Sequence, residues 1–156
     1  MNSSSAQLLL DSIEKTITEI DGISGSDAIV DSYLAKFLVV YISGIYEEII
    51  ENIILDYAKK NAGQNEIVNY IRTSVDKSFR NPDFSNIIGL VKKFGNSYWE
   101  DELKKMTSAQ VALDSIIANK NGLAHGQGTT TTLSDVKGFY NASNPFIKKI
   151  DELLLK

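Results

Sequence analysis

Residues 37–60 read FLVVYISGIYEEIIENIILDYAKK, and this stretch decides between a helical fold and one that contains a sheet. Its first six residues are apolar and rich in β-branched side chains, so a buried strand competes with a helix. The apolar pattern nevertheless continues at helical spacing through Ile45, Ile49 and Ile53, and strong helix formers surround it. The stretch therefore predicts one long helix, from about residue 27 to residue 61, that other helices cover on several sides.

Helical periodicity also marks the segments on either side of this stretch, and none of them alternates as a strand would. We expect further helices at residues 6–20, 66–79, 84–94, 97–105 and 107–120, and a last helix that ends near residue 155. Pro145 is expected to kink or split that last helix. The chain contains no repeat and no linker, so residues 1–156 predict a single all-α domain. The expected N-caps are Ser26, Thr107 and either Thr132 or Ser134.

The composition of the 156-residue chain is that of an ordinary globular domain, with 43% hydrophobic and 23% charged residues. The net charge of −4 excludes a protein that coats nucleic acid by general phosphate neutralisation, so any contact with nucleic acid must be a small local site. The most apolar run is shorter than the roughly 20 residues that span a bilayer, and the N-terminus lacks the features of a secretory signal. We therefore expect a soluble cytoplasmic protein with no membrane partner, which also suits the absence of cysteine.

Few residues offer chemistry of a general kind. One histidine and no cysteine cannot build the usual nitrogen–sulfur metal shell, so we expect no metal and no cofactor. The adjacent carboxylates Glu47 and Glu48 would point in different directions on a helix. Ser43 and Gly44 lie inside the predicted long helix, where glycine is unfavourable, and they predict a close helix–helix crossing.

The only histidine, His125, lies in the segment KNGLAHG at residues 120–126. A lone histidine is more often structural or merely exposed than catalytic, but this one follows an apolar helix that also carries Lys120 and Asn121. At about 100° per residue, residues 120, 121 and 124 share one face of a helix and residue 125 lies close to 121. A cation, an amide and a proton carrier could therefore cluster at one helix end. Gly126 is well placed as the stop that turns the chain away.

This segment resembles the motif of the HEPN superfamily, whose commonest form reads Arg-Asn, two further residues, then Ala-His-Gly after an apolar helix. Asn121, Ala124, His125 and Gly126 match that form, whereas Lys120 stands where the family has arginine. Residues 41–47, 113–117 and 132–136 are similar to the RiboL-PSP branch of the superfamily. The resemblance extends over about residues 30 to 155.

The resemblance implies a HEPN-type helical bundle with one long central helix, and a homodimer in which two copies of the motif meet. Many such domains are metal-independent endoribonucleases that leave a 2′,3′-cyclic phosphate and a 5′-hydroxyl end. By this resemblance His125 would move a proton at the ribose 2′-oxygen or the 5′-oxygen, Lys120 would stabilise the transition state, and Asn121 would orient the phosphate. Glu47 or Ser43 from the long helix would support the motif, although a glutamate that faces solvent is an equal alternative for Glu47.

The resemblance therefore leads us to expect an endoribonuclease with an RNA substrate, in a bacterial toxin–antitoxin, defence or stress system, with an antitoxin or other inhibitory partner. Lysine offers a point charge where arginine offers a planar fork, so the alternative is a catalytically degenerate HEPN module that binds RNA, a nucleotide or a partner protein. A third interpretation is a helical dimerisation domain in which His125 is only a helix C-cap.

Overall fold

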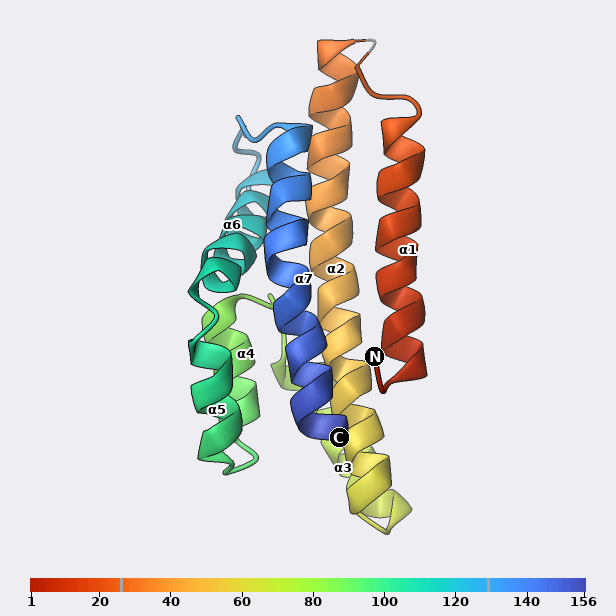
Figure 1. Cartoon of the computed structure of the whole chain (residues 1–156), viewed down its shortest axis with the longest axis vertical. Coiled ribbons are helices and arrows are strands. Elements are labelled where there is room, and N and C mark those ends of the chain that lie inside the picture. The colour runs from red at the N-terminus through yellow and green to blue at the C-terminus, as the bar shows by residue number, and fades with distance from the viewer. Residues whose placement is uncertain (26, 129) are drawn as a thin grey trace.

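The computed structural model describes residues 1–25, 27–128 and 130–156, and the described residues form α-helices and turns without a strand (Figure 1). This confirms the predicted all-α class. In chain order the helices are α1 (Ser4–Asp21), α2 (Ala28–Asn61), α3 (Asn65–Ser78), α4 (Phe84–Lys92), α5 (Ser97–Lys104), α6 (Thr107–Ala124) and α7 (Leu133–Leu155).

The long helix α2 is the centre of the bundle, and α1, α6 and α7 pack around it (Figure 1). Its core side chains are fully or almost fully buried and include Leu38, Ile42, Tyr46, Ile49 and Ile53. These residues recur every three or four positions, so a helix brings them to one side, whereas a strand would divide them between two faces. The helical prediction for residues 37–60 is therefore confirmed by the way these residues are buried.

The helix ends differ from the sequence predictions at several positions. Asp27 caps α2 by accepting a hydrogen bond of 2.7 Å from the N–H of Ile29, and Ser26, the predicted cap, lies outside the described residues. At α6 the predicted cap is wrong: Thr107 is the first helical residue, because Met106 occupies the cap position and packs against the core.

Helix α7 begins with the expected capping box, in which Thr132 and Asp135 exchange hydrogen bonds between side chain and backbone. Of the two outcomes predicted at Pro145, the split does not occur, because α7 continues through the proline to Leu155, and the kink stays a prediction. Buried side chains on both sides of the proline, Tyr140 before it and Phe146 after it, hold the two halves in one core, which outweighs the missing hydrogen bond.

The short helices α3 and α4 place the connection between them, residues 79–83, at the middle of the bundle. Helix α3 packs against the lower half of α2, and α4 and α5 lie below α6 (Figure 1). Residues 79–83, between α3 and α4, therefore pass between α2 and the last turns of α6. Their position is fixed by buried side chains at both ends, Phe79 and Phe84.

One face of α2 is apolar and uncovered in its upper half. We call Ile29, Tyr33, Phe37, Val40 and Gly44 the α2 stripe; its four side chains are 48–67% exposed and Gly44 is also exposed. A Cβ atom at Gly44 would meet nothing within 4 Å, so the predicted close crossing with another helix of the chain is wrong. The reason is that α3 covers only the lower half of this face (Figure 1).

Length and composition alone would let α2 cross a membrane, and 28% of its most apolar window is buried inside the bundle. A mostly buried core helix and a signal sequence pass the same test, so one helix of this kind is weak evidence for a membrane span.

Candidate functional site

Helix α6 ends in a Schellman motif that places the histidine. The N–H of Gly126 donates to the carbonyl of Leu123 at 3.1 Å, and the N–H of Gln127 donates to the carbonyl of Gly122 at 2.9 Å. Gly126 has a φ of 71°, in the left-handed region that glycine adopts without a Cβ penalty. The predicted role of Gly126 as the stop of this helix is confirmed, and His125 is the C-cap residue in front of it.

The side chain of His125 is exposed, and the described part of the chain gives its imidazole no hydrogen-bond partner. Its backbone N–H is used by the helix, where it donates to the carbonyl of Asn121 at 3.1 Å. The histidine is therefore not part of the core, and its side chain is open to solvent.

Lys120 lies in the last turns of α6 and is half-buried. Its Nζ donates a hydrogen bond of 2.6 Å to Oδ1 of Asn81, in the connection between α3 and α4. Asn81 has a φ of 55° and is the only non-glycine residue with a positive φ in the described part of the chain. Asparagine tolerates this left-handed conformation better than most residues. The connection before α4 thus supplies Asn81 as the hydrogen-bond acceptor for Lys120.

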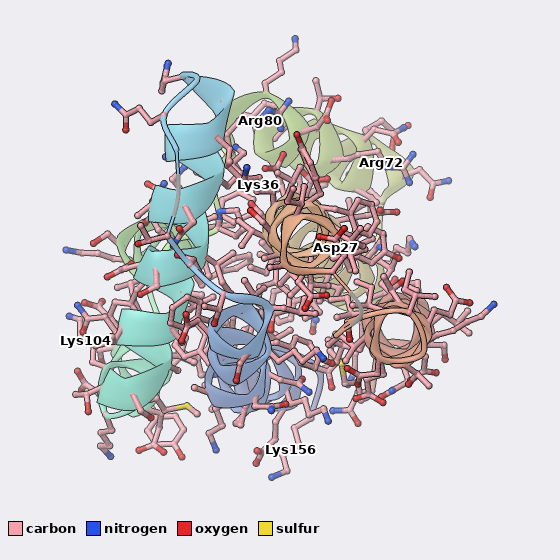
Figure 2. All side chains as sticks on the ribbon, turned by 90° about the horizontal axis from the view of Figure 1, so that it is seen from above. Asp27, Lys36, Arg72, Arg80, Lys104 and Lys156 are labelled. Carbon is pink, nitrogen blue, oxygen red and sulfur yellow. The ribbon has the colours of Figure 1, made fainter. Side chains whose placement is uncertain are left out.

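Glu47, on α2, contacts the same connection. Its Oε2 accepts the backbone N–H of Asn81 at 3.3 Å, and its Oε1 lies 3.4 Å from Nη1 of Arg80. Nη1 of Arg80 also lies 3.7 Å from Oε1 of Glu51, one turn further along α2. We call Lys120, Asn81, Arg80, Glu47 and Glu51 the cation cluster. In Figure 2, which looks down the bundle, Arg80 lies beside α3 on the same side of α2 as Lys36.

The two carboxylates of the cation cluster, Glu47 and Glu51, repel each other electrostatically. Burial raises the pKa of Glu51, the neighbouring charge of Glu47 raises it further, and Arg80 acts in the opposite direction. Arg80 therefore compensates part of the cost of placing two carboxylates one turn apart at a partly buried position.

The structure unites some of the residues that the sequence singled out. Glu47 and Lys120 both contact Asn81, so they belong to one cluster, whereas the alternative of a solvent-facing Glu47 does not hold because its side chain is only 25% exposed. Asn121 is half-buried beside Lys120, and Ser43 is buried within α2. Within the described residues no hydrogen bond joins these two side chains to the cluster.

Sequence reasoning missed Arg80 and Asn81, which it treated only as part of a helix break. Two signals could have marked them. The chain contains just two arginines, Arg72 and Arg80, and Arg80 precedes the Asn-Pro pair at residues 81–82. Neither signal alone shows where the side chain lies, because that depends on the packing of α3 and α4 against α2.

The described residues contain no group of three or more histidine, aspartate and glutamate side chains arranged to hold a metal ion. The last turns of α6 instead carry a lysine that Asn81 holds and, at the helix end, an exposed imidazole. No described hydrogen bond joins His125 to the cation cluster.

A sequence model for the family described as RiboL-PSP-HEPN matches residues 5–156 of the chain. The match includes the histidine motif, the connection that carries Arg80 and Asn81, and the whole of α2. No curated protein and no solved structure shows significant similarity to the chain.

Proposed function

The chain belongs to the RiboL-PSP-HEPN family, and from this premise we propose that it is a metal-independent endoribonuclease that acts as a homodimer. Membership of the family supports a nuclease or another RNA-related module. The observation that carries the finer proposal is the combination of an exposed His125 imidazole with Lys120, which Asn81 holds at 2.6 Å on the same helix end.

The proposed reaction needs two proton transfers and no water. A base removes the proton of the ribose 2′-hydroxyl, the 2′-oxygen forms a bond to phosphorus, and the bond between phosphorus and the 5′-oxygen breaks as that oxygen accepts a proton. The products are a 2′,3′-cyclic phosphate and a 5′-hydroxyl end. Lys120 would stabilise the extra negative charge on the phosphate oxygens in the transition state, and Asn121 would orient the phosphate.

The proposed homodimer rests on the number of proton-transfer groups that the reaction needs. The reaction is fastest with one proton acceptor and one proton donor, and each chain supplies a single histidine. Two copies that meet at the motif would supply the second imidazole, so that one His125 acts as the base and the other as the acid.

The α2 stripe is the surface that we propose for the second copy. At about 100° per residue, its positions and that of Glu47 fall within an arc of about 80° on α2. Exposed apolar patches of this kind mark interaction surfaces. A copy that covers the stripe therefore lies directly beside the cation cluster, where its own motif can complete the site.

The test of the reaction is cleavage of a defined RNA by purified protein in EDTA, with mass analysis of the products. We expect cleavage with cyclic phosphate ends, and we expect His125→Ala to lower the rate by about 10²- to 10⁴-fold without loss of helicity. An RNA with a single 2′-deoxy position at the cut should resist cleavage there. Metal-dependent activity, or equal activity of His125→Ala, would contradict the proposal.

A second candidate function is the degenerate module, which the lysine at position 120 favours. It predicts no cleavage by the wild type, appearance of cleavage in Lys120→Arg, and binding of RNA, a nucleotide or a partner protein by both. If neither protein cleaves or binds RNA, the dimerisation domain with His125 as a C-cap is the better description.

The test of the dimer is the mass of Phe37→Glu in solution. We expect the wild type to be a dimer and this variant to be a monomer with lost cleavage, because an interface cannot bury an unpaired charge cheaply. Tyr98→Glu is the matched control, since Tyr98 is an exposed aromatic residue of α5 outside the stripe. A monomeric wild type that sediments with lipid vesicles would show instead that the stripe contacts a membrane.

We also propose a bacterial toxin–antitoxin, defence or stress system and an inhibitory partner. An RNase with an exposed catalytic histidine needs restraint in the cell that makes it. Expression should therefore stop growth for the wild type and not for His125→Ala, and the protein that relieves the arrest would be the inhibitory partner.

A further inference from the structure

Arg80 lies in the cation cluster, next to a motif that carries Lys120 where the family form has arginine. Of the two arginines in the chain, it is the one that contacts Glu47, and the residue after it holds Lys120. We propose that Arg80 contacts the phosphate at the cleavage point and supplies the planar guanidinium fork that Lys120 lacks. This inference rests on the proposed ribonuclease function.

The contacts of Glu47 link Arg80 to Asn81, the hydrogen-bond partner of Lys120. One carboxylate oxygen lies 3.4 Å from Arg80, and the other accepts the backbone N–H of Asn81 at 3.3 Å. The side chain of Asn81 in turn accepts Lys120 at 2.6 Å. Consecutive Cα atoms are about 3.8 Å apart, so Arg80 and the partner of Lys120 are neighbours through the chain as well as through Glu47.

The backbone of the connection points to the same conclusion. Asn81 takes a positive φ of 55°, which costs free energy for a residue with a side chain. Such conformations persist where the surroundings determine them, and they are concentrated at functional sites. In this conformation the backbone N–H of Asn81 donates to Glu47 and its side-chain oxygen accepts from Lys120. Arg80 is the residue directly before it.

Arg80 retains donors for a phosphate. Its Nη1 donates to the carbonyl of Phe79 at 2.7 Å and lies near Glu47 and Glu51, whereas its Nη2 lies 4.0 Å from Oδ1 of Asp76. Among the described residues no carboxylate binds both ends of the guanidinium at short distance, although arginine has five N–H donors. The side chain is 55% exposed.

There is also space beside this arginine. Arg80 lines a pocket of about 210 Å³ with polar neighbours that include Ser78, Ser85, Asn86 and Lys93. A phosphate that entered from this side would meet the ammonium group of Lys93 and the hydroxyl of Ser85 as well as the guanidinium. The amide N–H groups of Asn86 and the hydroxyl of Ser78 already donate to oxygens of the chain.

The experiment compares Arg80→Ala and Arg80→Lys with Arg72→Ala, which removes the chain's other arginine, an exposed residue of α3. EDTA-resistant cleavage should fall about 10- to 100-fold in Arg80→Ala, because a charge-assisted hydrogen bond in the transition state is lost. Arg80→Lys should fall about 10-fold, because it keeps the charge and loses the fork. Arg72→Ala should stay within about 2-fold of the wild type, as an exposed charge outside the site.

A rescue variant separates a phosphate contact from a structural role. Lys120→Arg in the Arg80→Ala background should restore most of the lost rate, since it returns a guanidinium to the position that the family uses. A structural role for Arg80 predicts no rescue. Circular dichroism should show the same helicity in every variant.

Binding of a 2′-O-methyl RNA, which cannot react, distinguishes failure of this inference from failure of the proposed function. If the wild type does not cleave, the ribonuclease proposal fails, and weaker binding by Arg80→Ala than by Arg72→Ala still supports a phosphate contact at Arg80. Equal binding and equal cleavage by these two variants would overturn the inference. A wild type that neither cleaves nor binds RNA would overturn both proposals.

Discussion

The two ends of the motif on α6 are built in different ways. Lys120 is half-buried and held by Asn81, a residue 39 positions away in the sequence, which itself contacts α2. His125 is exposed, and its place is set by local hydrogen bonds of the helix end. The chain thus holds Lys120 through tertiary contacts, whereas no described contact orients the imidazole of His125. Under the proposed function, the second copy and the RNA would orient it.

Because of this difference, we expect substitutions at the two ends of the motif to affect the stability of the protein unequally. Changes at the lysine end should alter the free energy of unfolding, because they disturb contacts between α2, α6 and the connection before α4. Changes at the histidine end should alter stability only through the backbone of the helix end.

The largest effect on stability is expected at Asn81. Asn81→Ala removes the partner of Lys120 and places alanine at a φ of 55°, so we expect a loss of about 2 kcal/mol in the free energy of unfolding. Asn81→Gly removes the partner without the backbone cost and should lose about 1 kcal/mol. Urea unfolding measures both. Equal values for the two variants would show that the left-handed backbone carries no strain.

A smaller effect is expected at the histidine end. Gly126→Ala should cost about 1 kcal/mol, because the left-handed φ of 71° is unfavourable for alanine. A Cβ atom there would meet nothing within 4 Å, so steric overlap adds no cost.

Gly128→Ala is the matched control for that change, since a Cβ at Gly128 also meets nothing within 4 Å and its φ is not positive. It should leave the urea midpoint almost unchanged. A midpoint for Gly126→Ala as high as that of the control would mean that the helix end rearranges freely around His125.

The smallest effect concerns Glu51, one of the two α2 carboxylates beside Arg80. The folded-state pKa of Glu51 is raised, mainly by burial and then by Glu47, so folding favours its protonated form. This contribution is fully present at pH values below the ordinary glutamate pKa and is lost as the pH rises through the raised pKa. At pH 7 the ionised Glu51 therefore costs stability, and Glu51→Gln should be more stable by less than about 1 kcal/mol after solvent screening.

Thermal unfolding at pH 4 and pH 7 checks the sign of this effect. The advantage of Glu51→Gln should appear at pH 7 and shrink at pH 4, and Glu48→Gln, an exposed neighbour on α2, controls for the change in net charge. A less stable Glu51→Gln at pH 7 would show that the ion pair with Arg80 outweighs the burial of the carboxylate.

The sequence errors have one physical source. The cap at Thr107, the break at Pro145 and the crossing at Gly44 were inferred from local preferences of about 1 to 3 kcal/mol, and packing of the core outweighs preferences of that size. Met106 packs against the core in front of α6, and buried residues continue on both sides of Pro145. At Gly44 the expected neighbour is absent from the described chain, which is why this glycine now forms part of the α2 stripe.

The helical class, the long central helix and the position of the histidine can be predicted from the sequence alone, because they depend on periodicity and on residues within one or two turns. The stop at Gly126 can be predicted in the same way, since the Schellman motif is closed by neighbours in the chain. The meeting of Arg80 and Asn81 with Glu47 and Lys120 instead depends on how the helices pack. Those contacts link residues 33 to 39 positions apart, and no local pattern reports which distant side chains a folded core brings together.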